Sequence, residues 1–327
     1  MRLHRFLLRP LSPWATPLRS DTLYGLLLWR IAERRGDAAC RDAIAAFLEG
    51  RPPFALSSAL PEGDLFAPRL PPVPRALFRQ WVEEERAFTD RTGAALDLGG
   101  ALQAFKRFRK RAYLPLGDWR KHAGNLSVRG LFAAFCARAL PQQDGCANAP
   151  DAHTVEPHVA VDRRSGGALE GALYFNRLRW FREDTRLHLY ARTDAADDLL
   201  SLLAEVGELG FGKDAATGKG RFAVENDLDF RPGDLENDGP DALLLSVCAA
   251  PDMTDLDGWY ATETKRGKVW GTGISPFKNP ILLLREGSLL HRFPKGPFVL
   301  RGIHPQDRIV QITHPLALPC RLAEEVR

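Results

Sequence analysis

The segment that most restricts how this chain folds is GFGKDAATGKGRF, residues 210–222, with four glycines, two lysines and one arginine. Glycine adopts positive φ angles without strain and has no Cβ atom, so another backbone or a ligand can come very close. Leucines at positions 199, 200 and 203 predict an amphipathic helix before the segment, and the strand RFAVE begins at its end. The segment therefore forms a loop that leads from a helix into a strand.

Two common nucleotide-binding loops do not fit this segment. A P-loop has four residues between its glycines and a hydroxyl residue after its lysine, whereas five residues separate Gly212 from Gly218 and Lys219 precedes Gly220. A Rossmann loop follows a strand and opens a helix, the reverse of the order predicted here. Two interpretations stay open: backbone amides and cationic side chains that meet phosphates, or a turn that lets the helix pass close to the sheet.

The first sixty residues predict a strand, a helix and a strand. Apolar residues over 2–9 form the first strand, which ends at Pro10. The helix begins at Asp21, a good N-cap residue type, and Gly36 closes it. The segment FALSSAL, with prolines on both sides, forms the second strand.

Three later elements complete a ferredoxin-like domain. The strand RLHLYAR precedes a helix that Asp194 caps and that continues to about Val206, and the glycine loop then leads into RFAVE. With an insertion at about 61–157 and a hairpin at about 155–175 set aside, the order is strand, helix, strand, strand, helix, strand. The fold class predicted is α+β, with residues 1–231 as the N-terminal domain.

The insertion and the C-terminal part differ in character. The insertion predicts three helices, at about 74–90, 100–112 and 127–139. From residue 232 to 327 the chain has mostly short apolar segments punctuated by glycine and proline. We expect a second, smaller β-rich domain there, as a degenerate copy of the ferredoxin-like fold.

Charge and cysteine content narrow the class of protein. The 45 basic residues exceed the 41 acidic residues by four, which permits nucleic-acid binding without requiring it. The five cysteines are scattered without CxxC spacing, which favours a reducing compartment and no metal site. No uncharged apolar run approaches the length of a membrane span. We therefore expect a cytoplasmic protein with no cofactor, no metal and no membrane partner.

The glycine pattern, GxG followed by GxGxF after the second helix, resembles the signature loop of the RAMP superfamily of CRISPR RNA-binding proteins. The segments LSPWATPLRSDTLYGLLLW, PHVAVDRRSGGALEGALYF and NPILLLREGSLL are similar to segments of one family within it, the fourth subunits of type III-A Csm effector complexes. One departure is Val159 after His158, where the family often has asparagine, so a contact from that asparagine is not expected here.

The resemblance implies a non-catalytic subunit of a ribonucleoprotein in antiviral defence. Members of this family bind the repeat-derived 5′ tag of the CRISPR RNA (crRNA) and cap one end of the complex. They dock the large polymerase/cyclase-type subunit and the first backbone RAMP subunit. The hairpin acts as a thumb beside the guide–target duplex, where it displaces a base pair.

The candidate RNA-binding residues fall into five groups of basic, glycine and small polar residues. Asp21 is expected to be structural, and Phe105 and Phe108 fit core packing better than base stacking. The candidates are Gly210, Gly212, Lys213, Gly218, Lys219, Gly220 and Arg221 in the glycine loop; Arg19 and Ser20 before the first helix; Lys106, Arg109 and Lys110 in FKRFRKR; His158, Arg163 and Arg164 on the hairpin; and Lys265, Arg266 and Lys268.

Three alternatives remain. The chain is a metal-independent endoribonuclease that processes precursor crRNA, the equivalent cap subunit of another type III complex, or a scaffold whose glycine loop packs on a neighbouring subunit. A general base must lie within hydrogen-bond reach of the proton that it removes. No histidine is tied by sequence to a tyrosine, lysine or serine in a recognisable constellation, so no catalytic residue is predicted.

Overall fold

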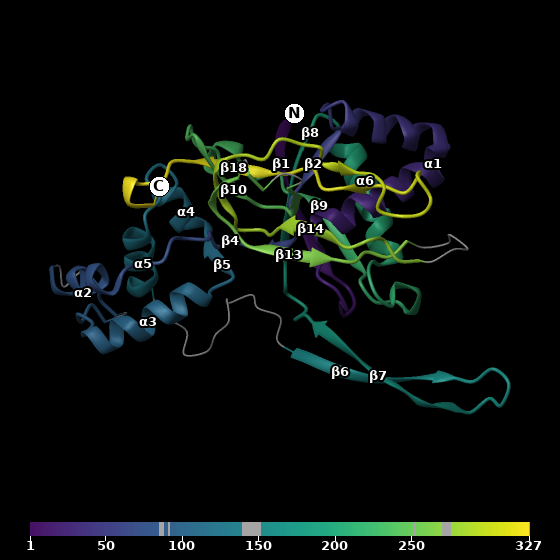
Figure 1. The fold of residues 1–327 in the computed structure, drawn as a ribbon, viewed down its shortest axis with the longest axis horizontal. Helices are drawn as coiled ribbons and strands as arrows, with labels where there is room; N and C mark the ends of the chain where they lie inside the picture. Colours follow the sequence, from purple (N-terminus) through teal and green to yellow (C-terminus); the bar gives the residue numbers. More distant parts are fainter. Residues whose placement is uncertain are drawn as a thin grey trace.

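The computed structural model describes residues 1–84, 88–90, 92–138, 152–250, 253–254, 256–269 and 276–326. It is a mixed α/β protein with antiparallel sheets, from whose body one long β-hairpin extends (Figure 1). None of the described helices is long and apolar enough to cross a membrane.

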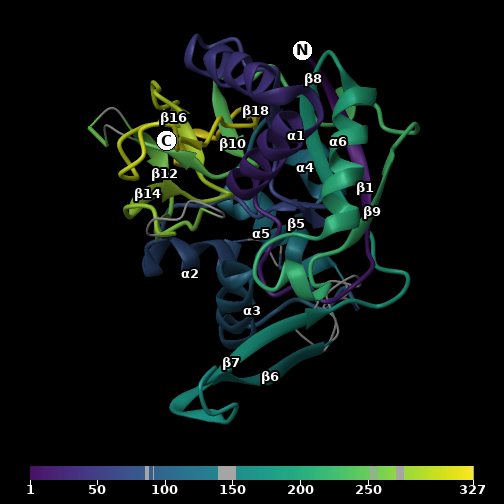
Figure 2. The same cartoon turned by 90° about the vertical axis from the view of Figure 1, so that its right-hand side faces the viewer.

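The first sheet has the strand order β2-β8-β1-β9, and every neighbouring pair is antiparallel. Two helices, α1 and α6, lie next to each other against it (Figure 2). The predicted order of the N-terminal elements is therefore observed. The elements are β1 (Arg2–Pro10), α1 (Ser20–Leu48), β2 (Phe54–Leu56), β8 (Leu187–Thr193), α6 (Ala196–Leu209) and β9 (Phe222–Asn226), with β3 (Leu60–Pro61) also paired to β8.

Both predicted helix N-caps are wrong. Arg19 occupies the N-cap position of α1, and the carboxylate of Asp21 binds Lys265 instead. Ala195 is the N-cap of α6, one residue after Asp194. The predicted stop at Gly36 appears as a kink, with φ 86° and ψ 166°, after which the helix resumes and continues to Leu48. A tertiary partner thus outweighs the local capping preference at Asp21.

The insertion contains the three predicted helices, α2 (Arg75–Glu84), α3 (Leu98–Lys110) and α5 (Val128–Ala137). A short helix and a two-stranded sheet were not predicted: α4 (Leu116–His122), and β4 (Asp64–Phe66) paired with β5 (Tyr113–Pro115). Aromatic side chains of the three longer helices pack together, with ring centroids of Phe105 and Phe108 5.1 and 5.4 Å from that of Phe132. The expected core role of Phe105 and Phe108 is confirmed.

The C-terminal part is built from short strands in three small sheets. The described residues after 231 form no α-helix, so the predicted second ferredoxin-like copy is not confirmed. The sheets are β12-β15-β10-β18, β11-β14-β13 and β16-β17, with β10 (Asp241–Leu244), β11 (Cys248–Ala249), β12 (Asp257–Trp259), β13 (Thr262–Lys265), β14 (Ile281–Leu284), β15 (Leu289–Arg292), β16 (Val299–Leu300), β17 (Gln311–Ile312) and β18 (Ala317–Cys320).

One hydrophobic core joins the insertion to the C-terminal strands. Leu243 and Leu318 belong to the same buried cluster as Phe132 of the insertion. Backbone bonds reinforce the contact, from Leu126 N to Arg321 O at 2.8 Å and from Arg321 N to the carbonyl of Ala123 at 2.8 Å. The division at residues 231 and 232 stays a prediction, but its two sides are packed together.

A buried histidine makes the stability of this fold sensitive to acid. His188 on β8 is 3% exposed, and burial, assisted by the charge of Arg5, lowers its pKa to about 4. An unfolded histidine has a pKa of about 6.5, so the unfolded chain binds the proton more tightly and acid favours unfolding. The stabilisation is complete above about pH 6.5 and declines as the pH falls towards 4.

We therefore expect the free energy of unfolding to fall by about 2 kcal/mol between pH 7 and pH 5 through His188 alone. Urea unfolding at both pH values measures it. His188→Gln should show a smaller decrease than the wild type, while His153→Gln, at an exposed position of the hairpin, should match the wild type. An equal decrease in all three proteins would contradict the assignment to His188.

Candidate nucleic-acid interface

The hairpin predicted at about 155–175 is confirmed, with longer strands. Strand β6 (Ala152–Val161) pairs with β7 (Ala168–Trp180) in continuous register from Ala152 opposite Trp180 to Val159 opposite Leu173. The register then shifts, and Val161 lies opposite Ala168. The strands project away from the sheet that carries β1 and β8 (Figure 1).

The tip of the hairpin is a tight turn that one carboxylate organises. Asp162 accepts hydrogen bonds from the backbone N–H of Arg164 at 2.9 Å and from the hydroxyl of Ser165 at 3.0 Å. These bonds lower the pKa of the Asp162 carboxyl. The predicted residues Arg163 and Arg164 are exposed in this turn, where their cationic groups can reach an anionic partner.

The base of the hairpin meets the glycine loop at Trp14. The backbone of Trp14 exchanges two 2.9 Å hydrogen bonds with that of Arg179 on β7. Its buried indole packs edge-on against Phe181 and Phe211, with both ring centroids 4.8 Å away, and also lies against Phe222. Trp14 therefore connects three separate segments: the one after β1, the hairpin base and the glycine loop.

Close packing explains most of the loop's glycines. All four have positive φ, and a Cβ on Gly220 would lie 2.3 Å from the carbonyl oxygen of Phe211. Gly210 is crowded by the backbone oxygen of Lys219 and Gly212 by the side-chain hydroxyl of Thr16, whereas nothing lies within 4 Å of a Cβ on Gly218. Several loop amides also donate within the protein, including Gly220 N to Pro13 O at 3.0 Å. Close contacts within the loop and with Thr16 therefore account for three of the four glycines, and the structure leaves space among them only at Gly218.

The two lysines of the loop bind the hairpin. Lys219 Nζ lies 3.0 Å from Glu156 Oε1 on β6. Lys213 Nζ donates to Asn176 Oδ1 on β7, and the Asn176 amide donates in turn to the carboxylate of Asp214 at 2.5 Å. The third cation of the loop, Arg221, is exposed, and its Nε donates to Glu208 O at 3.1 Å.

A stacked pair of rings completes this contact. The His158 ring lies parallel to that of Tyr174, with centroids 5.3 Å apart, and His158 Nε2 is 3.7 Å from Glu156. Lys213 Nζ lies 5.4 Å from the centroid of Tyr174. We call the whole contact the hairpin–loop clasp; its members are Glu156, His158, Tyr174 and Asn176 of the hairpin, and Lys213, Asp214 and Lys219 of the loop.

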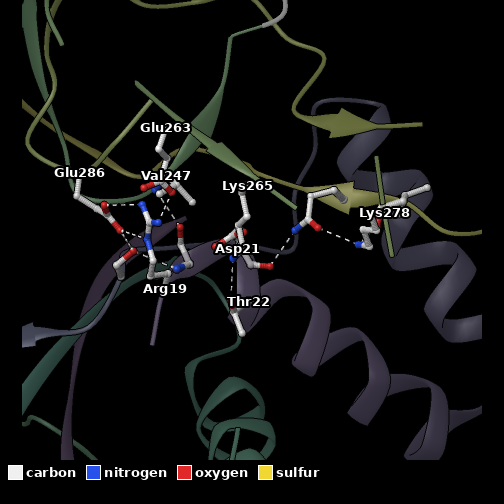
Figure 3. A network of polar contacts seen from close by, with 12 residues as sticks. Arg19, Asp21, Thr22, Val247, Glu263, Lys265, Lys278 and Glu286 are labelled. Carbon is white, nitrogen blue, oxygen red and sulfur yellow. Dashed lines mark hydrogen bonds and ion pairs between the residues drawn. The ribbon is translucent and has the colours of Figure 1, made fainter. Parts of the chain in front are cut away.

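The two candidates at the start of α1, Arg19 and Ser20, are bound to other residues inside the protein (Figure 3). Ser20 is fully buried, accepts a hydrogen bond from Val247 N at 3.0 Å, and donates its own N–H to Ser58 Oγ. Arg19 binds both oxygens of Glu286, at 3.0 and 2.9 Å, and also pairs with Glu263. Burial disfavours the charged guanidinium, but the two carboxylates hold the pKa of Arg19 above its ordinary value.

Lys265 belongs to the adjacent part of the same network. Its Nζ lies 2.5 Å from the carboxylate of Asp21, which is 1% exposed. Gln311 donates to the backbone oxygen of Asp21 and accepts from Lys278 Nζ at 2.8 Å (Figure 3). Burial lowers the pKa of Lys278 to about 8. The network fastens the start of α1 to the C-terminal sheets, in agreement with the structural role expected for Asp21.

The remaining candidates lie on two other surfaces. On α3, Lys106 and Lys110 are exposed, and Arg109 donates to the carbonyl oxygens of Leu70 and Pro71, both at 2.8 Å. In the C-terminal part, Arg266 and Lys268 are exposed, and their cationic groups lie 5.2 and 5.0 Å from the ring centroid of Phe277. Trp270, which the sequence places beside them, lies outside the described residues.

Comparison with known proteins finds similarity to solved structures only. No protein-family model and no curated protein matches the sequence. A chain of the Csm1–Csm4 cassette in complex with cA4 matches 99% of this chain over 100% of its own, with a TM-score of 0.59 and 16% identity. A chain of the same cassette with AMPPNP has the same coverage, a TM-score of 0.57 and 18% identity.

A chain from a different complex is also similar in structure. A chain of the Csm3–Csm4 subcomplex of the type III-A CRISPR-Cas interference complex aligns over 97% of this chain and 99% of its own, with a TM-score of 0.52 and 15% identity. Csm4 is the subunit that all these complexes have in common. The protein has a Csm4-like fold.

Within this Csm4-like fold, sequence reasoning missed the acidic and amide partners of its own candidates. Glu156 and Asn176 hold Lys219 and Lys213, and Glu286 holds Arg19. These partners are tens to hundreds of residues away along the chain, so no spacing pattern points to them. The hairpin motif, residues 157–175, marked the region as important, but Glu156 and Asn176 lie immediately outside its two ends.

Proposed function

We propose that this protein is the crRNA-binding subunit of a type III-A CRISPR effector complex, where it binds the 5′ tag and caps the assembly. The observation that carries the proposal is the Csm4-like fold over essentially the whole chain, together with a projecting hairpin fastened to a glycine loop. Its partners are a large subunit equivalent to Csm1 and a backbone subunit equivalent to Csm3, the two proteins found with Csm4 in the similar complexes.

The proposed RNA path runs past the hairpin–loop clasp. Lys213, Lys219 and Arg221 provide cationic groups at the body, and Arg163 and Arg164 provide them at the tip. Contacts of this kind are made to the RNA backbone, position it without reading its sequence, and weaken with added salt. The exposed cations on α3 and beside Phe277 are secondary candidates. Ser20 is left out of the proposed contacts because it is fully buried, and Arg19 and Lys265 are left out because they neutralise the carboxylates of Glu286 and Asp21, which are only 9% and 1% exposed.

We propose a role in binding and not in catalysis, although the clasp brings a histidine, a tyrosine and two lysines together. That combination is the one observation that favours the endoribonuclease alternative, since a histidine can accept the proton of a 2′-hydroxyl. Against it, His158 Nε2 is buried, its ring is stacked on Tyr174, and both lysine amines are bound by hairpin side chains.

The test measures RNA binding and cleavage together, in EDTA. Labelled crRNA with its 5′ tag and tagless RNA are titrated with the wild type, with Lys213→Glu/Lys219→Glu, and with Lys121→Glu/Lys295→Glu. The last variant makes the same change in net charge at two exposed positions. We expect the wild type to prefer tagged RNA and leave it intact, the clasp variant to lose at least about tenfold in affinity, and the control to lose little.

Three results would overturn this proposal. Cleavage in EDTA that His158→Ala abolishes would make the protein an endoribonuclease. Equal losses in both charge-reversed variants would show attraction to net charge only. If the free chain binds no RNA, the titration is repeated after assembly with the two partner subunits, and absence of binding there as well would exclude the crRNA-binding role.

A further inference from the structure

The hairpin is attached to the body by few contacts. In β6 and β7, Asn176 and Leu178 are the buried residues, and nearly all others are exposed or partly so. An isolated two-stranded hairpin is at best marginally stable, so its direction depends on what holds its base. Two backbone hydrogen bonds join Arg179 at the base to Trp14. The side-chain part of the attachment is the hairpin–loop clasp, whose ion pair joins Lys219 to Glu156.

Lys219 is shared by the clasp and the proposed RNA site, and in the clasp its partner is a carboxylate. It lies between Gly218, which leaves open space, and Gly220, which is packed against Phe211. Its side chain is 17% exposed, and that of Glu156 is 35% exposed, so solvent and a ligand can reach the pair. A phosphate bound to the same amine would be close to the Glu156 carboxylate, and two anions at that separation repel each other.

We propose that Lys219 exchanges Glu156 for an RNA phosphate, so that binding of the RNA backbone releases the hairpin. The proposal rests on the proposed function, because it assigns a switching role to the same site. After the exchange, Asn176 keeps its bond to Asp214, and Arg179 keeps its backbone bonds to Trp14, so the base stays attached while its direction is freed. Glu156 keeps His158, on the same strand, as a neighbour 3.7 Å away.

The length of the hairpin turns this exchange into a large motion. Asn176 lies ten positions after Gly166 in the turn, which at about 3.3 Å per residue gives an arm of ~30 Å. A rotation of about 10° at the base then moves the tip by roughly 5 Å. The free protein therefore holds the hairpin in one direction, and the RNA-bound protein lets it adapt to the strand beside it.

The test combines a distance and an affinity. Spin labels are attached at Ser165→Cys on the tip and at Ala38→Cys on α1, with Cys40 and Cys146 replaced by serine. Pulsed electron paramagnetic resonance then gives the distribution of distances between the two labels. Titration with labelled tagged crRNA gives the affinity. The variants are Glu156→Gln, Lys219→Glu and the exchanged pair Glu156→Lys/Lys219→Glu, with Glu170→Gln as a matched control that removes an exposed carboxylate from the same hairpin.

Each protein has its own expected pattern. The wild type should have a narrow distribution that RNA broadens, and Glu170→Gln should match it. Glu156→Gln should be broad without RNA and bind RNA about three- to tenfold tighter, because the competing carboxylate is gone. Lys219→Glu should be broad and bind at least about tenfold more weakly. The exchanged pair should be narrow, bind weakly and stay narrow with RNA.

Tighter binding by Glu156→Gln, together with the narrow distribution of the exchanged pair, would support the exchange. Unchanged or weaker binding by Glu156→Gln would overturn it and leave the proposed function intact. A wild-type distribution that RNA leaves narrow would also overturn it. Failure of the wild type to bind RNA, alone and with its partner subunits, would instead reject the proposed function, and the distances without RNA would still show whether the clasp directs the hairpin.

Discussion

Replacing Arg19 with alanine is expected to lower the free energy of unfolding by about 3–5 kcal/mol, because the change leaves a buried carboxylate without its cation. The side chain of Glu286 is 9% exposed and would keep only the Ser58 hydroxyl, at 2.6 Å, as a side-chain partner. Burial by itself raises the pKa of Glu286, yet the bonds from Arg19 and Ser58 hold it below its ordinary value. Denaturant unfolding at pH 7 measures the loss.

Arg120→Ala is the matched control for that loss. Arg120 pairs with Asp234 at 2.7 Å, but both side chains are almost half exposed, so its removal should change stability by at most about 1 kcal/mol.

The effect of Arg19→Ala should also depend on pH. Because Glu286 has a lowered pKa in the folded wild type, its stabilisation is present above the unfolded pKa and declines as the pH falls through the folded value. The gap between wild type and Arg19→Ala should therefore narrow in acid. A gap that is small at pH 7, or independent of pH, would contradict the argument.

Gly220→Ala is expected to destabilise the protein by about 3 kcal/mol and to weaken RNA binding. The new Cβ would lie 2.3 Å from Phe211 O and 2.7 Å from Phe211 N, so backbone must move, and alanine at φ 77° adds strain. The displaced segment carries Lys219 and touches Trp14, to which the hairpin base is bonded. Unfolding titration and RNA binding by the same protein measure the two effects.

Gly218→Ala distinguishes the backbone strain of a positive φ angle from the steric collision with Phe211. Gly218 has φ 83°, nearly the same as Gly220, but an added Cβ meets nothing within 4 Å. We expect only the strain of the left-handed conformation, about 1–2 kcal/mol, with the clasp in place. If both alanine variants lose equal stability, the collision with Phe211 does not matter, and the close packing of the loop is not what selects glycine at residue 220.

The sequence predicts those parts of the fold that depend on residues close to one another along the chain. The strand before Pro10, the three longer helices of the insertion and the hairpin around Gly166 follow from apolar spacing and turn residues, and all are observed. Asp21 shows where local reasoning fails. Its residue type favours an N-cap, but an ion pair with Lys265 on a distant strand takes the carboxylate.

The candidate site was predictable as a location and not as a set of contacts. Glycine spacing correctly marked a loop between α6 and β9, but it did not distinguish phosphate binding from packing, and at Gly220 packing accounts for the residue. Likewise, Lys213 and Arg19 have the same formal charge in the sequence, while the structure gives the first a place at the surface and the second buried carboxylate partners. These differences in surroundings arise from contacts between residues that are far apart along the chain.

The core that joins Phe132 to Leu243 and Leu318 has a consequence for the order of events on the ribosome. Phe132 is made 111 residues before Leu243 and 186 residues before Leu318. At about 5–20 residues per second, the apolar faces of the insertion wait roughly 5–40 s for the strands that cover them. During that interval the nascent chain exposes an aromatic surface of the kind that chaperones bind, and the insertion reaches its final packing only when the last strands have been made.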